Sequence, residues 1–197
     1  YAVSGIGDFD GDGRSDYAYS ALGADGTFTN QGEVTLELGN GTNQVINGHF
    51  ANMQLGAYID GLGDINGDGL SDVIIAAQNQ VGGNYEAYII NGGTSPTTTG
   101  SGVTTIRTPY EIMAGGAAGD INGDGFDDIA ISLNDGTDIN TYIIFGQTFP
   151  LPSVIDMTYL EDPDNALKIN HAGVSGATDY QITALGDLNG DGFDDIQ

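Results

Sequence analysis

The sequence contains no cysteine, and only three of its 197 residues are basic, namely Arg14, Arg107 and Lys168. Without cysteine the chain has neither disulfides nor thiolate metal sites. Phosphate binding needs clustered lysine and arginine, so nucleic acid is excluded as a partner and anionic membranes are disfavoured. No run of about 18 apolar residues is present, and we therefore expect no membrane insertion.

Acidic residues are abundant by contrast, and 28 Asp and Glu give a formal net charge of −25. Self-repulsion on this scale opposes a compact state unless the carboxylates are spread over solvent or a cation sits among them. Disorder is the simplest interpretation of a strongly acidic chain. Segments rich in β-branched and aromatic residues at 72–77, 88–90 and 142–145 argue against disorder. The 33 glycines lack the collagen period and indicate many tight turns.

Four ten-residue segments align without gaps and divide the chain into tandem repeats. Each reads Gly-Asp-x-Asp/Asn-Gly-Asp-Gly-x-x-Asp, at 7–16, 63–72, 119–128 and 186–195. The first aspartates of successive segments are 56, 56 and 67 residues apart. We predict repeat 1 at residues 1–56, repeat 2 at 57–112, repeat 3 at 113–179 and a partial repeat 4 at 180–197.

Every repeat is expected to be β-structure throughout. A strand leads into the acidic segment, and a second strand leaves it at 16–21, 72–77 and 128–133. A third strand is predicted at 32–38, 85–90 and 141–145, and a fourth at 44–46, 103–107 and 153–157. The sequence thus predicts an all-β chain of tandem four-stranded blades, either a partial β-propeller or an open β-repeat array. We interpret it as an excerpt of a longer array or as a protomer completed by its neighbours.

The acidic segments have the pattern of calcium-binding loops. Ca²⁺ takes six to eight oxygens, which such a loop supplies from side chains at positions 1, 3 and 5 and a backbone carbonyl at position 7. An aspartate at position 9 would close each site here, giving about four bound Ca²⁺. The predicted ligands are Asp8, Asp10, Asp12, the Arg14 carbonyl and Asp16; Asp64, Asn66, Asp68, the Leu70 carbonyl and Asp72; Asp120, Asn122, Asp124, the Phe126 carbonyl and Asp128; and Asp187, Asn189, Asp191, the Phe193 carbonyl and Asp195.

Other uses of these loops fit the residues less well. An EF-hand needs a bidentate Glu on a helix at position 12, where this chain has Tyr19, Ile75 and Ile131. Magnesium resists so many protein oxygens, and zinc lacks its Cys and His ligands. Asp-Gly clusters also form ordinary turns, but four ungapped copies with oxygen at every ligand position favour calcium.

Two further features of the loops lead to separate expectations. Position 6 is glycine in every copy, as the sharp turn of a calcium loop requires. Position 8 is acidic only in the third and fourth copies, as Asp127 and Asp194. We expect these two carboxylates to face solvent or to support the ligands rather than to bind metal.

The ten-residue core, followed by an apolar strand, resembles the FG-GAP repeat of integrin α-subunit propellers and of many bacterial secreted proteins. The resemblance covers nearly the whole chain. It implies four-stranded blades with Ca²⁺ held in the hairpin between the first and second strands. It also implies roles in cell adhesion, ligand binding and scaffolding.

Nothing in the sequence points to catalysis. Paired carboxylates could suggest a glycosidase, but these are accounted for as metal ligands, and His49 and His171 stand isolated. We expect a non-enzymatic protein at an extracellular or cell-surface location, because millimolar calcium sites suit extracellular modules.

Three functions stay open. They are an adhesive or structural scaffold module, a self-assembling protomer of an extracellular filament, and a non-catalytic region of a secreted enzyme. Neighbouring repeats or protomers are the expected partners, together with protein or glycan ligands. Tyr58, Tyr85, Tyr88 and Tyr142 could form a glycan-binding strip, although packing inside or between blades is the favoured use.

Overall fold

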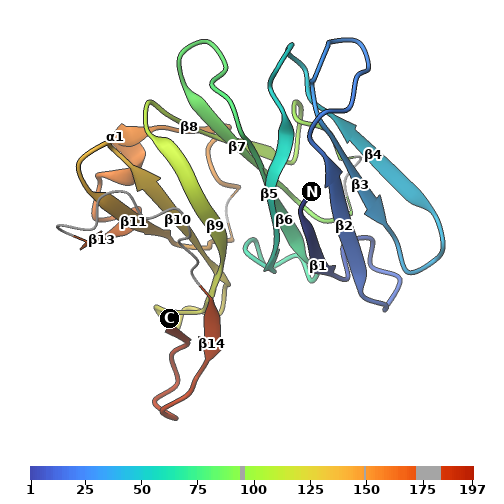
Figure 1. The fold of residues 1–197 in the computed structure, drawn as a ribbon. Coiled ribbons are helices and arrows are strands. Elements are labelled where there is room, and N and C mark those ends of the chain that lie inside the picture. Colours follow the sequence, from blue (N-terminus) through green and yellow to red (C-terminus); the bar gives the residue numbers. More distant parts are fainter. Residues whose placement is uncertain (94–95, 149, 172–182) are drawn as a thin grey trace.

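The computed structural model describes residues 1–93, 96–148, 150–171 and 183–197. These residues form three open sheets of four or five strands, followed by a two-stranded ribbon, and the sheets lie side by side in chain order (Figure 1). The predicted all-β repeat fold is confirmed in its main feature, because the secondary structure of the described residues is nearly all β-strand, mostly in sheets of four or five strands. No helix in the described ranges is long and apolar enough to cross a bilayer.

The first sheet has the order β1 (Val3–Gly7), β2 (Asp16–Ala21), β3 (Glu33–Glu37) and β4 (Asn43–Asn47), with antiparallel neighbours. Strand β2 has the predicted bounds. Strands β1, β2 and β4 have one buried and one exposed face, because their side chains alternate across the sheet. Ile6, Ala18 and Ile46 lie on the buried face, whereas Val3, Tyr17 and Tyr19 lie on the exposed face.

The second sheet contains β5 (Leu55–Gly63), β6 (Asp72–Ala77), β7 (Tyr85–Ile90) and β8 (Val103–Thr108), again antiparallel and in chain order. Every residue of β6 is buried, so both faces of this strand are covered. This explains why the residues after Asp72, Val73 to Ala77, form a continuous apolar run instead of an alternating pattern. Strands β6 and β7 have the predicted bounds.

The third sheet has the order β13 (Ala166–His171), β11 (Ile139–Ile144), β10 (Asp128–Asn134) and β9 (Glu111–Gly119). The ribbon that follows pairs β14 (Ala184–Gly186) with β15 (Asp195–Ile196). The predicted boundary between repeats 3 and 4, at residues 179 and 180, lies outside the described residues.

The prediction of a fourth strand of repeat 3 at 153–157 is wrong. Val154 and Ile155 form the short strand β12, which pairs in parallel with β8 and makes the second sheet five-stranded. Asp156 then caps a four-residue helix, α1 (Met157–Leu160), by accepting the backbone N–H of Thr158 and Tyr159.

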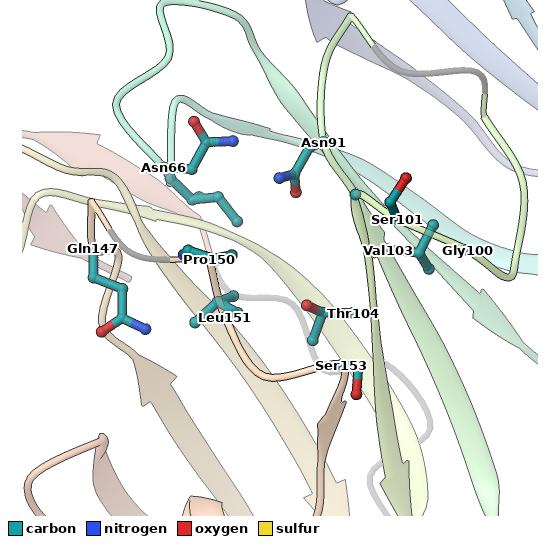
Figure 2. A pocket seen from close by; sticks show the side chains of 12 residues that line it. Asn66, Asn91, Gly100, Ser101, Val103, Thr104, Gln147, Pro150, Leu151 and Ser153 are labelled. Carbon is teal, nitrogen blue, oxygen red and sulfur yellow. The ribbon is translucent and has the colours of Figure 1, made fainter.

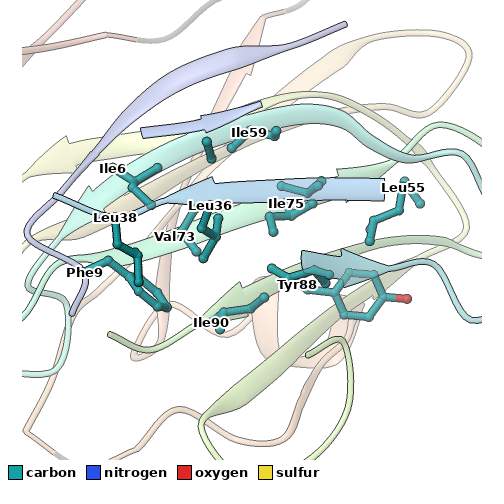
Figure 3. Packing of buried hydrophobic residues seen from close by; sticks show 14 of the residues in the cluster. Ile6, Phe9, Leu36, Leu38, Leu55, Ile59, Val73, Ile75, Tyr88 and Ile90 are labelled. Atoms are coloured by element: carbon teal, nitrogen blue, oxygen red, sulfur yellow. The ribbon is translucent and has the colours of Figure 1, made fainter. Parts of the chain in front are cut away.

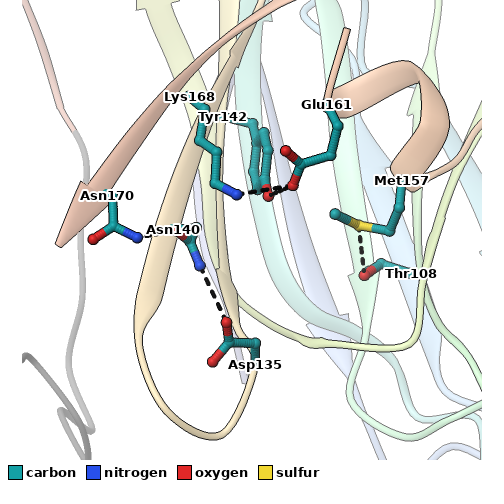
Figure 4. Close-up of polar contacts among 8 residues, drawn as sticks. All are labelled: Thr108, Asp135, Asn140, Tyr142, Met157, Glu161, Lys168 and Asn170. Atoms are coloured by element: carbon teal, nitrogen blue, oxygen red, sulfur yellow. Dashed lines mark hydrogen bonds and ion pairs between the residues drawn. The ribbon is translucent and has the colours of Figure 1, made fainter. Parts of the chain in front are cut away.

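Strand β13 is instead the fourth strand of the third sheet. Beyond α1, the Glu161 carboxylate accepts hydrogen bonds from Lys168 Nζ at 2.8 Å and from the Tyr142 hydroxyl at 2.7 Å (Figure 4). These contacts link the turn after α1 to β11 and β13. The extra length of repeat 3 therefore provides the β12–α1 detour before its fourth strand begins.

Apolar side chains fill the space between consecutive sheets. Figure 3 shows the first layer, where Ile6 and Leu36 of the first sheet pack with Val73, Ile75 and Tyr88 of the second. A second layer joins Leu62, Ile74 and Ile89 to Ile129 and Ile131 of the third sheet. Burial of one such side chain contributes about 1.5–3 kcal/mol, so these layers are the main force that stacks the sheets.

Candidate metal loops

Each acidic segment is the loop between the first and second strand of its sheet. The loops join β1 to β2, β5 to β6, β9 to β10 and β14 to β15. In all four, the position-9 aspartate is the first residue of the second strand. The hairpin location implied by the family resemblance is therefore the one observed.

The carboxylate at position 1 folds the loop around itself. In the second loop, Asp64 Oδ1 accepts the N–H of Gly67 at 2.7 Å, and Asp64 Oδ2 accepts that of Gly69 at 2.8 Å. The side-chain oxygen of position 3 accepts the N–H of position 5, and that of position 5 accepts the N–H of position 7, at 2.9 Å each. The other three loops repeat this set of bonds.

The glycine at position 6 is needed for its backbone conformation. Its φ is +82° at Gly13, +86° at Gly69, +92° at Gly125 and +94° at Gly192. Apart from chain neighbours, no described residue has an atom within 4 Å of the place where a Cβ would be at these positions, so crowding is not the reason. The left-handed conformation alone accounts for glycine here, as the sequence predicts.

The aspartate at position 9 ties the loop to its sheet. Asp72 is fully buried, and it accepts the N–H of Ile65 at 3.1 Å and that of Gly92, after the third strand, at 2.8 Å. Asp16 and Asp128 make the equivalent pairs of bonds in their own repeats.

Burial makes ionisation of two position-9 carboxylates costly. It raises the pKa of Asp72 to about 7 and that of Asp128 to about 6, and the hydrogen bonds from backbone N–H groups offset the rise in part. The charges at positions 1 and 5 of the same loop add to the increase. A cation among these carboxylates would favour their ionised form.

The first loop brings three acidic groups into the geometry of a cation site. One carboxylate oxygen from each of Asp8, Asp10 and Asp16 lies within 4.8 Å of the others. Calcium–oxygen bonds are about 2.3–2.6 Å long, so two ligands on opposite sides of one Ca²⁺ have this separation. These residues fit the ion, whereas Asp12 lies outside the group.

The other loops have asparagine at position 3, and the described residues there show no such acidic trio. Asn66 Oδ1 accepts the Asp68 N–H, while its Nδ2 lies 3.5 Å from Asp72 Oδ1. Asn189 has the same orientation toward Asp195. An amide nitrogen is not a calcium ligand, so ion binding here requires the amide oxygen to turn inward.

Asp127 and Asp194, at position 8, contact the preceding loop. Asp127 Oδ2 accepts the backbone N–H of Asp64 at 2.8 Å, and Asp194 Oδ2 accepts that of Asp120 at 3.0 Å. Burial raises the pKa of Asp127, with a further contribution from the charge of Asp194. The sequence shows an acid at position 8 but not which loop it contacts.

Tyr58, Tyr85, Tyr88 and Tyr142 do not form the surface strip that a glycan would need. Tyr88 and Tyr142 are buried between sheets, and their hydroxyls donate to Glu86 and Glu161. The Glu86 carboxylate is also buried and pairs with Arg107 at 2.7 Å. Packing is therefore the use of these two tyrosines.

A small pocket lies beside the second loop (Figure 2). Its volume is about 170 Å³, and its described lining includes Asn66, Asn91, Thr104, Gln147 and Leu151. None of the described lining residues has an ionisable side chain. The pocket could offer amide and hydroxyl groups to a small polar molecule, but no acid or base.

Comparison with known proteins finds a family similarity in the central part of the chain. Residues 64–131 match the family model described as FG-GAP-like repeat. The span begins at position 1 of the second loop and ends within β10, so it includes the second and third loops. No curated protein matches the sequence. Residues 64–131 are therefore similar to FG-GAP-like repeats.

Proposed function

We propose that this chain is a calcium-stabilised extracellular repeat module with an adhesive or structural scaffold role. The observation that carries the proposal is a set of hydrogen bonds that recurs in all four loops. In every copy the carboxylate at position 1 accepts the backbone N–H of positions 4 and 6. In the first loop, Asp8, Asp10 and Asp16 already converge. When bound, Ca²⁺ would supply the positive charge that the nearly cation-free sequence lacks.

The exposure of the loops supports an extracellular setting. Position 5, the carboxylate of Asp12, Asp68, Asp124 and Asp191, is exposed in every loop. Exposed ligands lose conformational freedom on binding, which lowers the affinity for the ion. Such sites match the millimolar calcium outside cells.

The proposed role is structural and not catalytic. The position-1 and position-9 carboxylates accept backbone N–H groups, and the pocket beside the second loop offers no ionisable group among its described residues. A scaffold of this kind would present its sheets and loops to neighbouring repeats, proteins or glycans.

Isothermal titration with CaCl₂, after treatment with chelator, tests the proposal. We expect about four ions per chain, and weaker or no binding of MgCl₂ under the same conditions. A variant with Asp8→Asn and Asp16→Asn should bind one ion fewer, while Asp25→Asn, outside the loops, should bind as many as the wild type. Absence of calcium binding in the millimolar range would refute the proposal.

A second candidate function, assembly with a neighbouring repeat, is favoured by the exposed face of the first sheet. Tyr17 and Tyr19 are 50% and 40% exposed. The equivalent Val73 and Ile75 pack against the first sheet, and Ile129 and Ile131 pack against the second. The first sheet thus exposes the face that later sheets bury against a preceding repeat.

Sedimentation velocity in calcium and in chelator tests assembly through this face. Four Ca²⁺ would reduce the formal charge from −25 to about −17, which weakens the repulsion between protomers. We expect association in calcium and its loss when Tyr17 and Tyr19 are both replaced by serine. A monomer in both solutions would refute this candidate.

A further inference from the structure

Consecutive loops are joined by a reciprocal contact between position 1 of one repeat and position 8 of the next. Asp64 donates its backbone N–H to Asp127 Oδ2 at 2.8 Å, and its carbonyl accepts the Asp127 N–H at 3.3 Å. Asp120 and Asp194 make the same two contacts at 3.0 Å each. The position-8 aspartate of one repeat therefore holds the backbone of the position-1 aspartate in the loop of the preceding repeat.

The glycine before position 1 makes room for this contact. A Cβ on Gly63 would lie 2.0 Å from Asp127 Oδ2, and one on Gly119 would lie 2.2 Å from Asp194 Oδ2. At the equivalent Gly186, no atom of the other described residues lies within 4 Å of the Cβ place, its chain neighbours aside. The atoms that crowd Gly63 and Gly119 thus come from the following repeat and not from the glycine's own loop.

The side chain at position 7 strengthens the same junction. Phe126 covers Gly67, where a Cβ would lie 2.5 Å from its ring, and Phe193 covers Gly123 at 2.6 Å. In the part of the chain that the structure describes, Gly190 of the fourth loop has no residue beyond its chain neighbours within 4 Å of its Cβ place. Two adjacent residues of one repeat therefore close over the loop of the preceding repeat.

We propose that Asp127 and Asp194 are positioning residues that latch the metal loop of the preceding repeat. The loop of repeat 2 is then held in its binding conformation by repeat 3, and the loop of repeat 3 by repeat 4. Because linkage is reciprocal, an ion in one loop strengthens the docking of the next repeat. This last step rests on the proposed function, whereas the latch itself does not.

The first junction provides a natural contrast. Its position-8 residue is Ser71, whose N–H donates to the Asp8 carbonyl at 3.0 Å. Serine carries no charge, and hydrogen bonds to a charged acceptor are stronger than neutral ones. The latch between repeats 1 and 2 is accordingly weaker, and a carboxylate placed at position 71 should strengthen it.

Amide hydrogen exchange of the full chain in chelator, read by NMR, tests the latch without metal. We expect Asp127→Ala to accelerate exchange of the Asp64 amide by roughly ten- to a hundredfold, as the loss of a charge-assisted hydrogen bond implies. The amides of Gly123 and Gly125, in the loop that contains the mutation, should keep their rates. Asp127→Asn retains an acceptor oxygen and should restore much of the protection.

The reverse substitution tests a gain of contact. Ser71→Asp should slow exchange of the Asp8 amide several-fold and leave that of Asp120 unchanged. Unaltered Asp64 exchange in Asp127→Ala, or equal acceleration in both loops, would overturn the proposal, as would an Asp8 amide that does not respond to Ser71→Asp.

A calcium titration read at the same amides separates the two proposals. In Asp127→Ala, the amides of Gly67 and Gly69 should report calcium binding about tenfold weaker in the second loop, whereas those of Gly123 and Gly125 should report little change in the third loop. If wild-type amides do not respond to calcium at all, the proposed function fails, and exchange in chelator still decides whether the latch exists.

Discussion

Replacing Asp72 by alanine separates the structural use of a position-9 carboxylate from its proposed use as a metal ligand. Asp72 is fully buried and accepts two backbone N–H groups, from Ile65 and Gly92. Alanine leaves both donors without a partner, at about 1–3 kcal/mol each, so the free energy of unfolding in chelator should fall by about 2–6 kcal/mol.

Asp68 is the matched control in the same loop. Its carboxylate is exposed and accepts the N–H of Leu70 at 2.9 Å, which water can replace after truncation. Asp68→Ala should therefore change the free energy of unfolding in chelator by only about 0.5 kcal/mol. Asp72→Asn, which keeps one acceptor oxygen, should lie between the two alanine variants.

Denaturant unfolding in chelator and in calcium provides the measurement. A site filled at a hundredfold excess over Kd contributes about 2.7 kcal/mol, and both alanine variants should lose this contribution in calcium. Relative to the wild type, the loss of unfolding free energy in Asp68→Ala should thus rise from about 0.5 kcal/mol in chelator to about 3 kcal/mol in calcium. Equal stability of Asp72→Ala and Asp68→Ala in chelator would refute the structural role assigned to Asp72.

Three further predictions concern the metal, the pH and the glycines. Calcium should raise the wild-type melting temperature by about 5–10 °C for each site that unfolds with the chain, and chelator should reverse the rise; identical melting curves would contradict this. Burial raises the pKa of Asp60 above its ordinary 3.8, partly offset by the hydrogen bond from Ser4, so its contribution to stability is complete below pH 3.8 and is lost as the pH rises through the raised pKa. Between pH 4 and pH 7, Asp60→Asn should lose less free energy of unfolding than the wild type, and parallel pH curves would disprove this assignment. Gly69→Ala should cost about 1–2 kcal/mol for its left-handed backbone, and Gly67→Ala should cost more because Phe126 must also move; a smaller cost at Gly67 would argue against the packing of Phe126.

The loops and the strands that leave them could be predicted from the sequence because their causes are local. Glycine at position 6 is set by one φ angle, and the side-chain oxygens at positions 1, 3 and 5 accept backbone N–H groups within five residues. Strands β2 and β6 begin at the position-9 aspartate, and because this start is also set locally, both strands have the predicted bounds. The chain's candidate ligands are thus brought near one another by interactions within single segments.

Tertiary structure alone decided the features that depend on partners far along the chain. Val154 and Ile155 have the composition of any short strand, and only the folded structure shows that they pair with β8 at the edge of the second sheet. The sequence predicts that Asp127 and Asp194 face solvent or support the ligands, but not that they contact Asp64 and Asp120, 63 and 74 residues away. No local pattern encodes such a partner, because the contact exists only after apolar layers such as Ile74 against Ile129 have stacked one sheet on the next.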